Sequence, residues 1–290
     1  MIGYGCVGRT DSGRVRENNE DAFVSTSIPD TPLVLLAAID GVGGYEGGEV
    51  AASITAQTLL SFVLEHRADK PLDLMKKAMV EANNAVCAEK AVRPSLDRMA
   101  CVASAALVDL DRKQAYVAHV GDSRIYLYGP DGLRKITHDH SLVGYLEDNG
   151  DITEFQAMHH PQRNLIDRCL GDIPRVLGED GFLESGIYPI PPEGKLLLCS
   201  DGLTDLVTSR RIAEVLASGS DTVGKADALV AEANAEGGKD NITVVLLELF
   251  PEGESESGRT DAPVSEKSDS PRRGWRARLT TRLSRGKKKD

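Results

Sequence analysis

The clearest hydrophobic pattern in the chain is the run LVLLAAIDGVGGYEGGE at residues 33–49. Six consecutive apolar residues, 34–39, predict a strand with both faces buried, because a strand with one solvated face would alternate apolar and polar positions. The run ends at Asp40, and the glycines after it allow the backbone to approach another group closely. We therefore expect Asp40 at the rim of the core, with its carboxylate pointing outward. An Asp-Gly pair alone more often marks a plain turn.

Further elements follow from the spacing of the apolar residues. Short apolar runs predict strands at 4–7, 22–24, 195–199 and 242–249. Helical periodicity predicts helices at 49–66, from Pro71 to about 89, and at 141–149, 209–217 and 222–235. We expect one antiparallel meander from four consecutive strands at 102–110, 114–120, 124–128 and 133–137. The segment 138–194 predicts short helices and loops.

The composition is that of an ordinary globular protein. The chain has 290 residues, 41% of them hydrophobic and 27% charged, which fits one or two domains. Its five cysteines are scattered without a C-x-x-C spacing, so they favour neither a disulfide framework nor a zinc site. No apolar segment approaches ~18 residues, and the start of the chain does not resemble a signal peptide. We expect a cytoplasmic protein.

Charge divides the chain into an acidic body and a basic tail. The net charge of −11 consists of −15 on residues 1–250, −4 on 251–270 and +8 on 271–290. Nucleic acid is not an expected partner, because its phosphates would be repelled by the acidic body. Residues 251–270 have the composition of a disordered linker.

The basic tail, residues 271–290, has an apolar edge. Trp275, Leu279 and Leu283 are spaced four apart among arginines. As a helix, this segment would suit weak contact with an anionic membrane surface, which would make the protein peripheral to the membrane. A disordered solubilising tail is the competing interpretation.

Acidic residues recur at the ends of apolar strands. Asp40, Asp122, Asp201 and Asp240 stand in AAIDG, HVGDSR, LLCSDG and GKDNIT, and Glu20-Asp21 precedes another strand. Each alone could be a turn former or a helix cap. Clustered together, they would raise one another's pKa unless cations neutralised them, and the sequence places few Lys or Arg beside them.

The ligand type narrows the choice of cation. Carboxylates suit Mg²⁺, Mn²⁺ or Ca²⁺, whereas zinc or copper would require His or Cys. The six histidines are not spaced as a metal-binding set, so we expect core or surface roles for His119, His159, His160 and the others.

Seven motifs resemble, in order and spacing, those of the type 2C family of metal-dependent serine/threonine protein phosphatases, especially its bacterial stand-alone members. They are RVRENNED (14–21), DGVGGYEGGEVA (40–51), AHVGDSRIYL (118–127), THDHSLV (137–143), HPQRN with LIDRCLG (160–171), LLLCSDGLTD (196–205) and GGKDNITVV (237–245). Together they span about residues 3–250, and none of them alone would be specific.

The resemblance implies an α+β fold with two stacked antiparallel β-sheets flanked by helices on both sides, an α-β-β-α sandwich. Residues 1–250 would be the phosphatase domain, and residues 251–290 a linker and tail. The implied activity is hydrolysis of phosphoserine and phosphothreonine by in-line attack of a hydroxide bridging two divalent metals. The cofactors would be two or three Mn²⁺ or Mg²⁺ ions.

The resemblance also assigns the ligands of two cations. Asp40 corresponds to the carboxylate that bridges them. Asp201 and Asp240 correspond to ligands of the first cation. The carbonyl of Gly41 and the side chain of Glu20 correspond to contacts with the second.

Two further roles follow from the same motifs. Asp122 with Asp201 corresponds to the third metal site of bacterial members, and Arg16 corresponds to the arginine that holds the substrate phosphate. No protein nucleophile is needed, and the chain shows neither a nucleophile elbow nor a phosphatase-type cysteine loop.

The chain departs from the family pattern at three places. Val42 stands where eukaryotic relatives carry His and bacterial relatives usually carry Met. The segment MACVAS (99–104) lacks the usual glycine and threonine, and Asn164 stands where some relatives place a third-metal contact. These departures leave the two-metal core intact and bear on the third site.

Two other functions remain open. An inactive relative serving as a binding module should lack a metal ligand, and none is missing. Another two-metal phosphohydrolase, acting on nucleotides or nucleic acid, should carry a basic groove. The expected partners are phosphorylated proteins, including Ser/Thr kinases and their substrates, and the expected state is a monomer.

Overall fold

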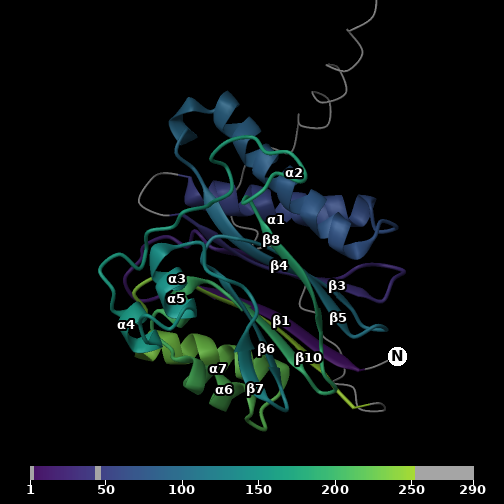
Figure 1. Cartoon of the computed structure of the whole chain (residues 1–290), viewed down its shortest axis with the longest axis vertical. Coiled ribbons are helices and arrows are strands. Elements are labelled where there is room, and N and C mark those ends of the chain that lie inside the picture. Colours follow the sequence, from purple (N-terminus) through teal and green to yellow (C-terminus); the bar gives the residue numbers. More distant parts are fainter. Residues whose placement is uncertain (1–2, 43–46, 252–290) are drawn as a thin grey trace, which may run out of the picture.

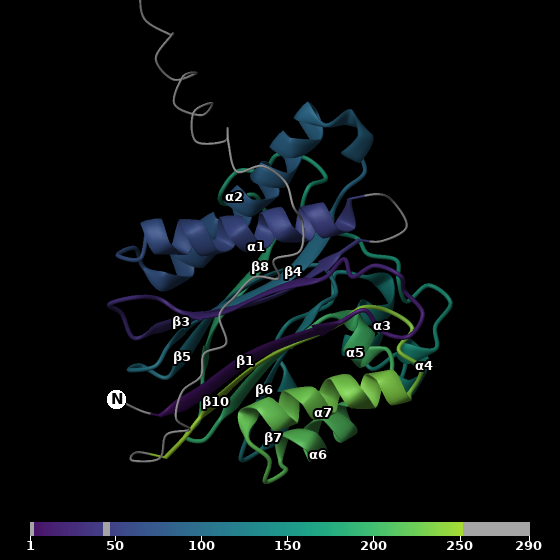
Figure 2. The ribbon, with the colours of Figure 1, turned by 180° about the vertical axis from the view of Figure 1, so that it is seen from behind.

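The computed structural model describes residues 3–42 and 47–251, which form two stacked five-stranded sheets with helices outside both (Figures 1 and 2). The first sheet has the order β1 (Tyr4–Asp11), β10 (Ile242–Leu249), β9 (Lys195–Cys199), β6 (Arg124–Gly129), β7 (Gly132–Lys135). The second has the order β2 (Ala22–Ser27), β3 (Leu33–Gly41), β4 (Cys101–Asp109), β5 (Gln114–Val120), β8 (Glu184–Pro189). All the strand pairs are antiparallel. The predicted α+β sandwich is confirmed.

The helices cover the outer faces of the sandwich. α1 (Gly48–Glu65) and α2 (Pro71–Val92) lie over the second sheet, and α6 (Ser209–Leu216) and α7 (Thr222–Ala235) lie over the first (Figure 2). The short helices α3 (Leu142–Asp148), α4 (Glu154–Met158) and α5 (Asp201–Thr204) gather at the end opposite the N-terminus (Figure 1), and a 3₁₀ turn spans Pro94–Leu96. Within the described residues, no helix is both long and apolar enough to cross a membrane.

Strand β3 shows how the apolar run produces the layers. Successive side chains point to opposite faces of a strand. Leu35, Ala37 and Ile39 pack in the core beneath α1 and α2. Val34, Leu36 and Ala38 pack in the core between the two sheets. The prediction that this strand is buried on both faces is therefore confirmed, and the strand brings Asp40 to the edge of the sandwich.

The predicted four-stranded meander is wrong. β4 pairs with β5 in the second sheet and β6 pairs with β7 in the first, so the chain crosses between the sheets at residues 121–123. Gly121 makes this crossing with φ of +111°, a conformation that favours glycine. Apolar periodicity reports burial and does not report which sheet a strand joins. The crossover places Asp122 between the sheets.

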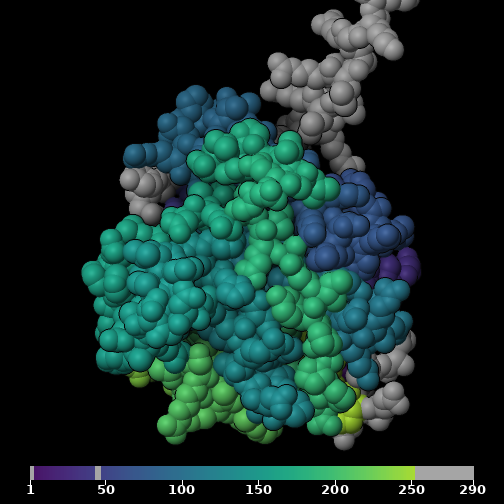
Figure 3. All heavy atoms as spheres, in the orientation of Figure 1, coloured from purple at the N-terminus to yellow at the C-terminus, as the bar shows by residue number. Residues whose placement is uncertain are grey.

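The edge strand β8 was not predicted. It contains Gly186 and Pro189, and both residue types are unfavourable inside a sheet, although Pro is tolerated at an edge. Pairing with β5 forms it nevertheless. Figure 3 shows the segment leading into β8, in green, running across this face of the molecule. The linker and basic tail predicted for residues 251–290 lie outside the described residues, except for Pro251.

Candidate metal centre

All seven residues to which the resemblance assigns a role line one pocket at the edge between the sheets. Four elements bring the aspartates there: Asp40 is the penultimate residue of β3, Asp122 lies at the crossover after β5, Asp201 begins α5, and Asp240 precedes β10. The pocket lining is Arg16, Glu20, Asp40, Gly41, Val42, Val102, Asp122, Asn164, Ile166, Asp201, Asp240 and Asn241. The structure therefore brings together the residues that the sequence separates by up to 224 positions.

Burial and mutual repulsion raise the pKa of the central carboxyl groups. Desolvation is the largest cause for Asp40, Asp122 and Asp201, and neighbouring carboxylates add to it. The pKa of Asp122 rises to about 7. Such a group of carboxyls becomes stable in its ionised form when a divalent cation offsets the charge.

Two arginines form ion pairs with carboxylates at the rim of the acidic cluster. The sequence did not suggest these ion pairs. Arg16 Nη2 lies 2.8 Å from Asp240 Oδ2, and Arg163 Nε lies 2.7 Å from Asp205 Oδ2. Arg16 is also close enough to Glu20 and Asp201 for both to raise its pKa, in addition to Asp240. Positive side chains therefore stand at the rim of the acidic cluster.

Glycines make room for Glu20 beside the start of α1. A Cβ on Gly41 would lie 2.6 Å from the carbonyl oxygen of Glu20, and a Cβ on Gly48 would lie 2.3 Å from its Oε2 atom. That oxygen is buried and has no hydrogen-bond partner among the described residues. Since an unpartnered buried carboxylate oxygen is costly, a cation is the ligand that this position fits.

Three residues to which the sequence analysis assigned no role also contribute to the site. Asp21, which the sequence places next to Glu20, is buried with its Oδ1 unpartnered, and burial raises its pKa to about 6. Ser200 donates to its other oxygen at 2.9 Å. Asp205 lies with Asp122 and Asp201 around a smaller adjoining cavity. Asp205 could have been predicted from its spacing of four residues from Asp201, because residues with this spacing lie on the same face of a helix.

Asn241 is the third missed contributor, and it positions the loop that carries Glu20 and Arg16. Its Nδ2 donates to the carbonyl oxygens of Ser12 at 3.1 Å and Asn18 at 2.9 Å, and its Oδ1 accepts from the N–H of Glu20 at 2.8 Å. The sequence did not predict this role for Asn241, because an Asp-Asn pair is more typical of a turn or a helix cap.

The positions that depart from the family pattern also reach the pocket. Val42 lines it, so an aliphatic side chain stands where eukaryotic relatives carry His. Its N–H donates to the carbonyl oxygen of Ala100 at 3.0 Å. Asn164 lines the pocket as well, from the loop after α4.

Comparisons with known proteins agree with this geometry. The family described as Protein phosphatase 2C matches residues 11–234. Serine/threonine phosphatase Stp of Listeria innocua is 36% identical over 245 residues, covering 83% of this chain and 94% of Stp. The crystal structure of the Mycobacterium tuberculosis serine/threonine phosphatase PstP/Ppp has a TM-score of 0.74 and 32% identity, covering 87% of this chain and 100% of that one.

A further solved structure contains the expected metal. The catalytic domain of serine/threonine protein phosphatase PstP in complex with two manganese ions has a TM-score of 0.73 and 30% identity, covering 87% of this chain and 100% of that one. The sandwich and its acidic edge are thus those of metal-dependent phosphatases. The chain belongs to the protein phosphatase 2C family, as its motifs indicated.

Proposed function

We propose that this chain hydrolyses phosphoserine and phosphothreonine in proteins, using two or three Mn²⁺ or Mg²⁺ ions bound at the edge of the sandwich. The observation that carries the proposal is the convergence of all seven predicted residues on one pocket, with buried carboxyl groups at its centre. The serine/threonine phosphatases to which the chain is similar, and the two manganese ions in one of them, support it.

The residues have the following proposed roles toward the cations. Asp40 would be shared by two of them, Asp201 and Asp240 would hold the first, and Glu20 and the carbonyl oxygen of Gly41 would hold the second. Asp122 with Asp201 would hold a third, and the nearby Asp205 favours a cation there. When bound, divalent cations supply an activated water that attacks phosphorus in line, and they offset charge on the phosphate.

Arg16 serves the substrate phosphate in this proposal. A guanidinium can donate two parallel hydrogen bonds to two phosphate oxygens. Its side chain is 41% exposed in the pocket, so a phosphate entering from solvent can reach it. Val42 offers no proton to the departing serine or threonine oxygen, and in this proposal that oxygen takes its proton from water.

Arg16→Ala is expected to raise KM for a phosphopeptide by about 10- to 100-fold, the cost of losing one or two charge-assisted hydrogen bonds. Arg16→Lys should recover only part of the loss, because a lysine keeps the charge without the fork. Steady-state kinetics with Mn²⁺ titration measures both. Arg67→Ala, at an exposed position after α1, is the control. A rise in the Mn²⁺ requirement without a change in KM would assign Arg16 to the cations instead.

We infer further that the protein is a cytoplasmic monomer whose substrates include Ser/Thr kinases and proteins that they phosphorylate. Residues 1–250 form the phosphatase domain in this proposal, and residues 251–290 a linker and basic tail. The proposed domain boundaries are supported by the match of the family to residues 11–234 and by the change of composition after residue 250.

The basic tail is proposed to hold the protein weakly on anionic membranes. The full chain is expected to float with vesicles that contain phosphatidylglycerol, and a chain ending at residue 251 should remain in the soluble fraction with unchanged kcat/KM. Phosphatidylcholine vesicles and high salt serve as controls, since the attraction is electrostatic. Equal partitioning of the two chains would refute membrane docking by the tail.

A further inference from the structure

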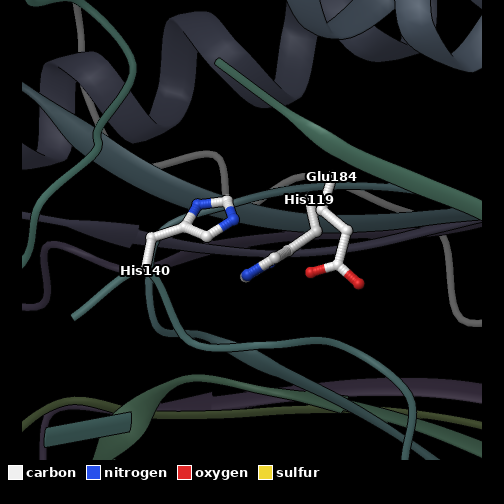
Figure 4. A group of neighbouring side chains, drawn as sticks. All are labelled: His119, His140 and Glu184. Carbon is white, nitrogen blue, oxygen red and sulfur yellow. The ribbon is translucent and has the colours of Figure 1, made fainter. Parts of the chain in front are cut away.

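Three side chains meet beside the metal centre without lining its pocket: His119 of β5, His140 of the loop after β7, and Glu184 of β8 (Figure 4). Their ligand atoms lie within 4.8 Å of one another, as those of a cation site would. The hydrogen bonds of the two imidazoles decide whether a cation could bind there.

Both imidazoles already use the lone pairs that a cation would need. His140 Nδ1 accepts from the N–H of Gly121 at 3.0 Å, so the proton of the neutral ring is on Nε2. His119 Nε2 lies 3.1 Å from the carbonyl oxygen of His138 and must donate to it, and its Nδ1 contacts the hydroxyl of Ser104 at 2.9 Å. The cluster is therefore a hydrogen-bonded junction and does not fit a metal ion.

His140 is bonded twice to the residue that precedes Asp122. Its backbone N–H donates to the carbonyl oxygen of Gly121 at 2.7 Å, and the N–H of Gly121 donates to its ring. A Cβ at Gly121 would also lie 2.2 Å from side-chain atoms of Val102. The backbone that carries Asp122 is thus held against the side chain of Val102 and hydrogen-bonded to the imidazole of His140.

His140 also holds the loop that forms another wall of the pocket. Its carbonyl oxygen accepts from the N–H of Asp167 at 2.7 Å, and the adjacent Ser141 forms an isolated antiparallel bridge with Ile166. Ile166 and Asn164 line the pocket that contains Asp122. One residue therefore connects the crossover turn and the 164–167 loop.

The residues on either side of His140 have separate structural roles. The carboxylate of Asp139 lies 2.6 Å from Arg124 Nη2 and 3.3 Å from Lys135 Nζ. Ser141 caps α3, accepting from the N–H of Gly144 at 3.1 Å. Asp139 and Ser141 therefore have structural partners of their own. The ring of His140 is the group that accepts the hydrogen bond of the Gly121 amide.

We propose that His140 is a positioning residue whose neutral imidazole, by accepting the Gly121 amide hydrogen bond, holds Asp122 in the orientation that binds a third divalent cation. This inference rests on the proposed role of Asp122 as a ligand. Only a ring without a proton on Nδ1 can do this, and burial with the nearby His119 and Arg168 lowers the pKa of His140 to about 3. The ring is therefore neutral at the pH values at which the enzyme would be assayed.

Two amide substitutions matched in polarity test the inference. The Oδ1 atom of Asn in His140→Asn replaces the Nδ1 acceptor, whereas the side-chain oxygen of Gln in His140→Gln falls near Nε2. Mn²⁺ binding is counted by electron paramagnetic resonance, and exchange of the Gly121 amide is followed by NMR. We expect His140→Gln to raise the dissociation constant of the weakest Mn²⁺ binding event about tenfold. Loss of a residue that orients a metal ligand typically has an effect of this size. His140→Asn should stay within about threefold of the parent chain, with the Gly121 amide still protected.

Controls separate this inference from the assignment of Asp122. Asp122→Asn should remove the weakest Mn²⁺ event outright, and its persistence would overturn both proposals. If that event disappears while His140→Asn and His140→Gln bind Mn²⁺ alike, the role of the His140 acceptor alone is refuted. Lys225→Met removes a buried partner of Glu248 under α7, far from the pocket, and should leave Mn²⁺ binding unchanged.

Discussion

Asp40→Asn is expected to lower kcat/KM for Mn²⁺-supported hydrolysis of p-nitrophenyl phosphate by on the order of 10³-fold. Asp40 stands at the end of a strand buried on both faces. Burial and the charges of Asp21, Asp201 and Asp122 raise the pKa of its carboxyl group. In the proposed site it is the one ligand shared by two cations. An amide keeps the shape of the side chain and removes its charge, so the fold should survive while cation binding fails.

Steady-state kinetics over a range of Mn²⁺ concentrations measures this effect. Asp240→Asn should also abolish activity, and Asp131→Asn, in the exposed β6–β7 turn, is the matched control expected to behave as the parent chain. Activity surviving both site substitutions would show that the metal centre is assigned wrongly. An unsubstituted chain that binds Mn²⁺ without hydrolysing phosphopeptides would favour a binding module, and a preference for nucleotides would favour the other class of two-metal hydrolase.

The site was predictable where it depends on strand ends. An Asp at or next to the end of an apolar run is fixed at the edge of a sheet. Asp40 and Asp201 stand where such runs end, and Asp240 stands just before one begins. Antiparallel strands of two stacked sheets bring their ends together at common edges, so several such residues can converge. The resemblance to the family then indicated which of these edge residues bind the same cations.

The remaining site contributors depend on tertiary placement that no local pattern encodes. Asp122 reaches the pocket because the chain changes sheets after Gly121, whereas the sequence indicated a continuous meander. Asn241 and Arg163 act through hydrogen bonds to segments more than 40 residues away. Hydrophobic periodicity carries no information on such pairs, because both partners are polar and part-exposed.

Removing divalent cations is expected to make the stability of the protein fall as pH rises from about 6.5 to about 8, the range around the pKa of about 7 of Asp122. Without a cation, the folded-state pKa of Asp122 is about 7, and those of Asp40 and Asp201 lie well above their ordinary values. In the unfolded chain these groups ionise near pH 4. The folded state therefore binds more protons than the unfolded state in this range, and its free energy of unfolding must decrease with pH.

The buried histidines affect stability in a different pH range. The pKa of His140 is lowered to about 3, so between about pH 3 and 6.5 the unfolded chain binds the extra proton and stability rises with pH. Above about pH 6.5 the unfolded histidine is also neutral, and the contribution is constant. Below about pH 8 the buried cysteines are mainly protonated in both states, because burial raises their folded-state pKa to about 12 and an unfolded cysteine ionises near pH 8.5. The fall in stability between about pH 6.5 and 8 therefore reports the carboxyl groups.

Saturating Mn²⁺ should abolish this fall, because the carboxyl groups must lose their protons to bind it and are then ionised in both the folded and the unfolded state. At a hundredfold excess over the dissociation constant, each bound ion adds about 2.7 kcal/mol, so two ions should raise Tm by roughly 10–20 °C at pH 8 and by less at pH 6.5. Differential scanning fluorimetry with EDTA or Mn²⁺ across this range measures the difference. Asp40→Asn should make the fall in EDTA shallower and the Mn²⁺-induced rise in Tm smaller, since it removes a carboxyl that titrates and a ligand that two ions share. A Mn²⁺-induced rise in Tm that did not grow with pH would show that the cations bind elsewhere, at groups already ionised in the folded protein.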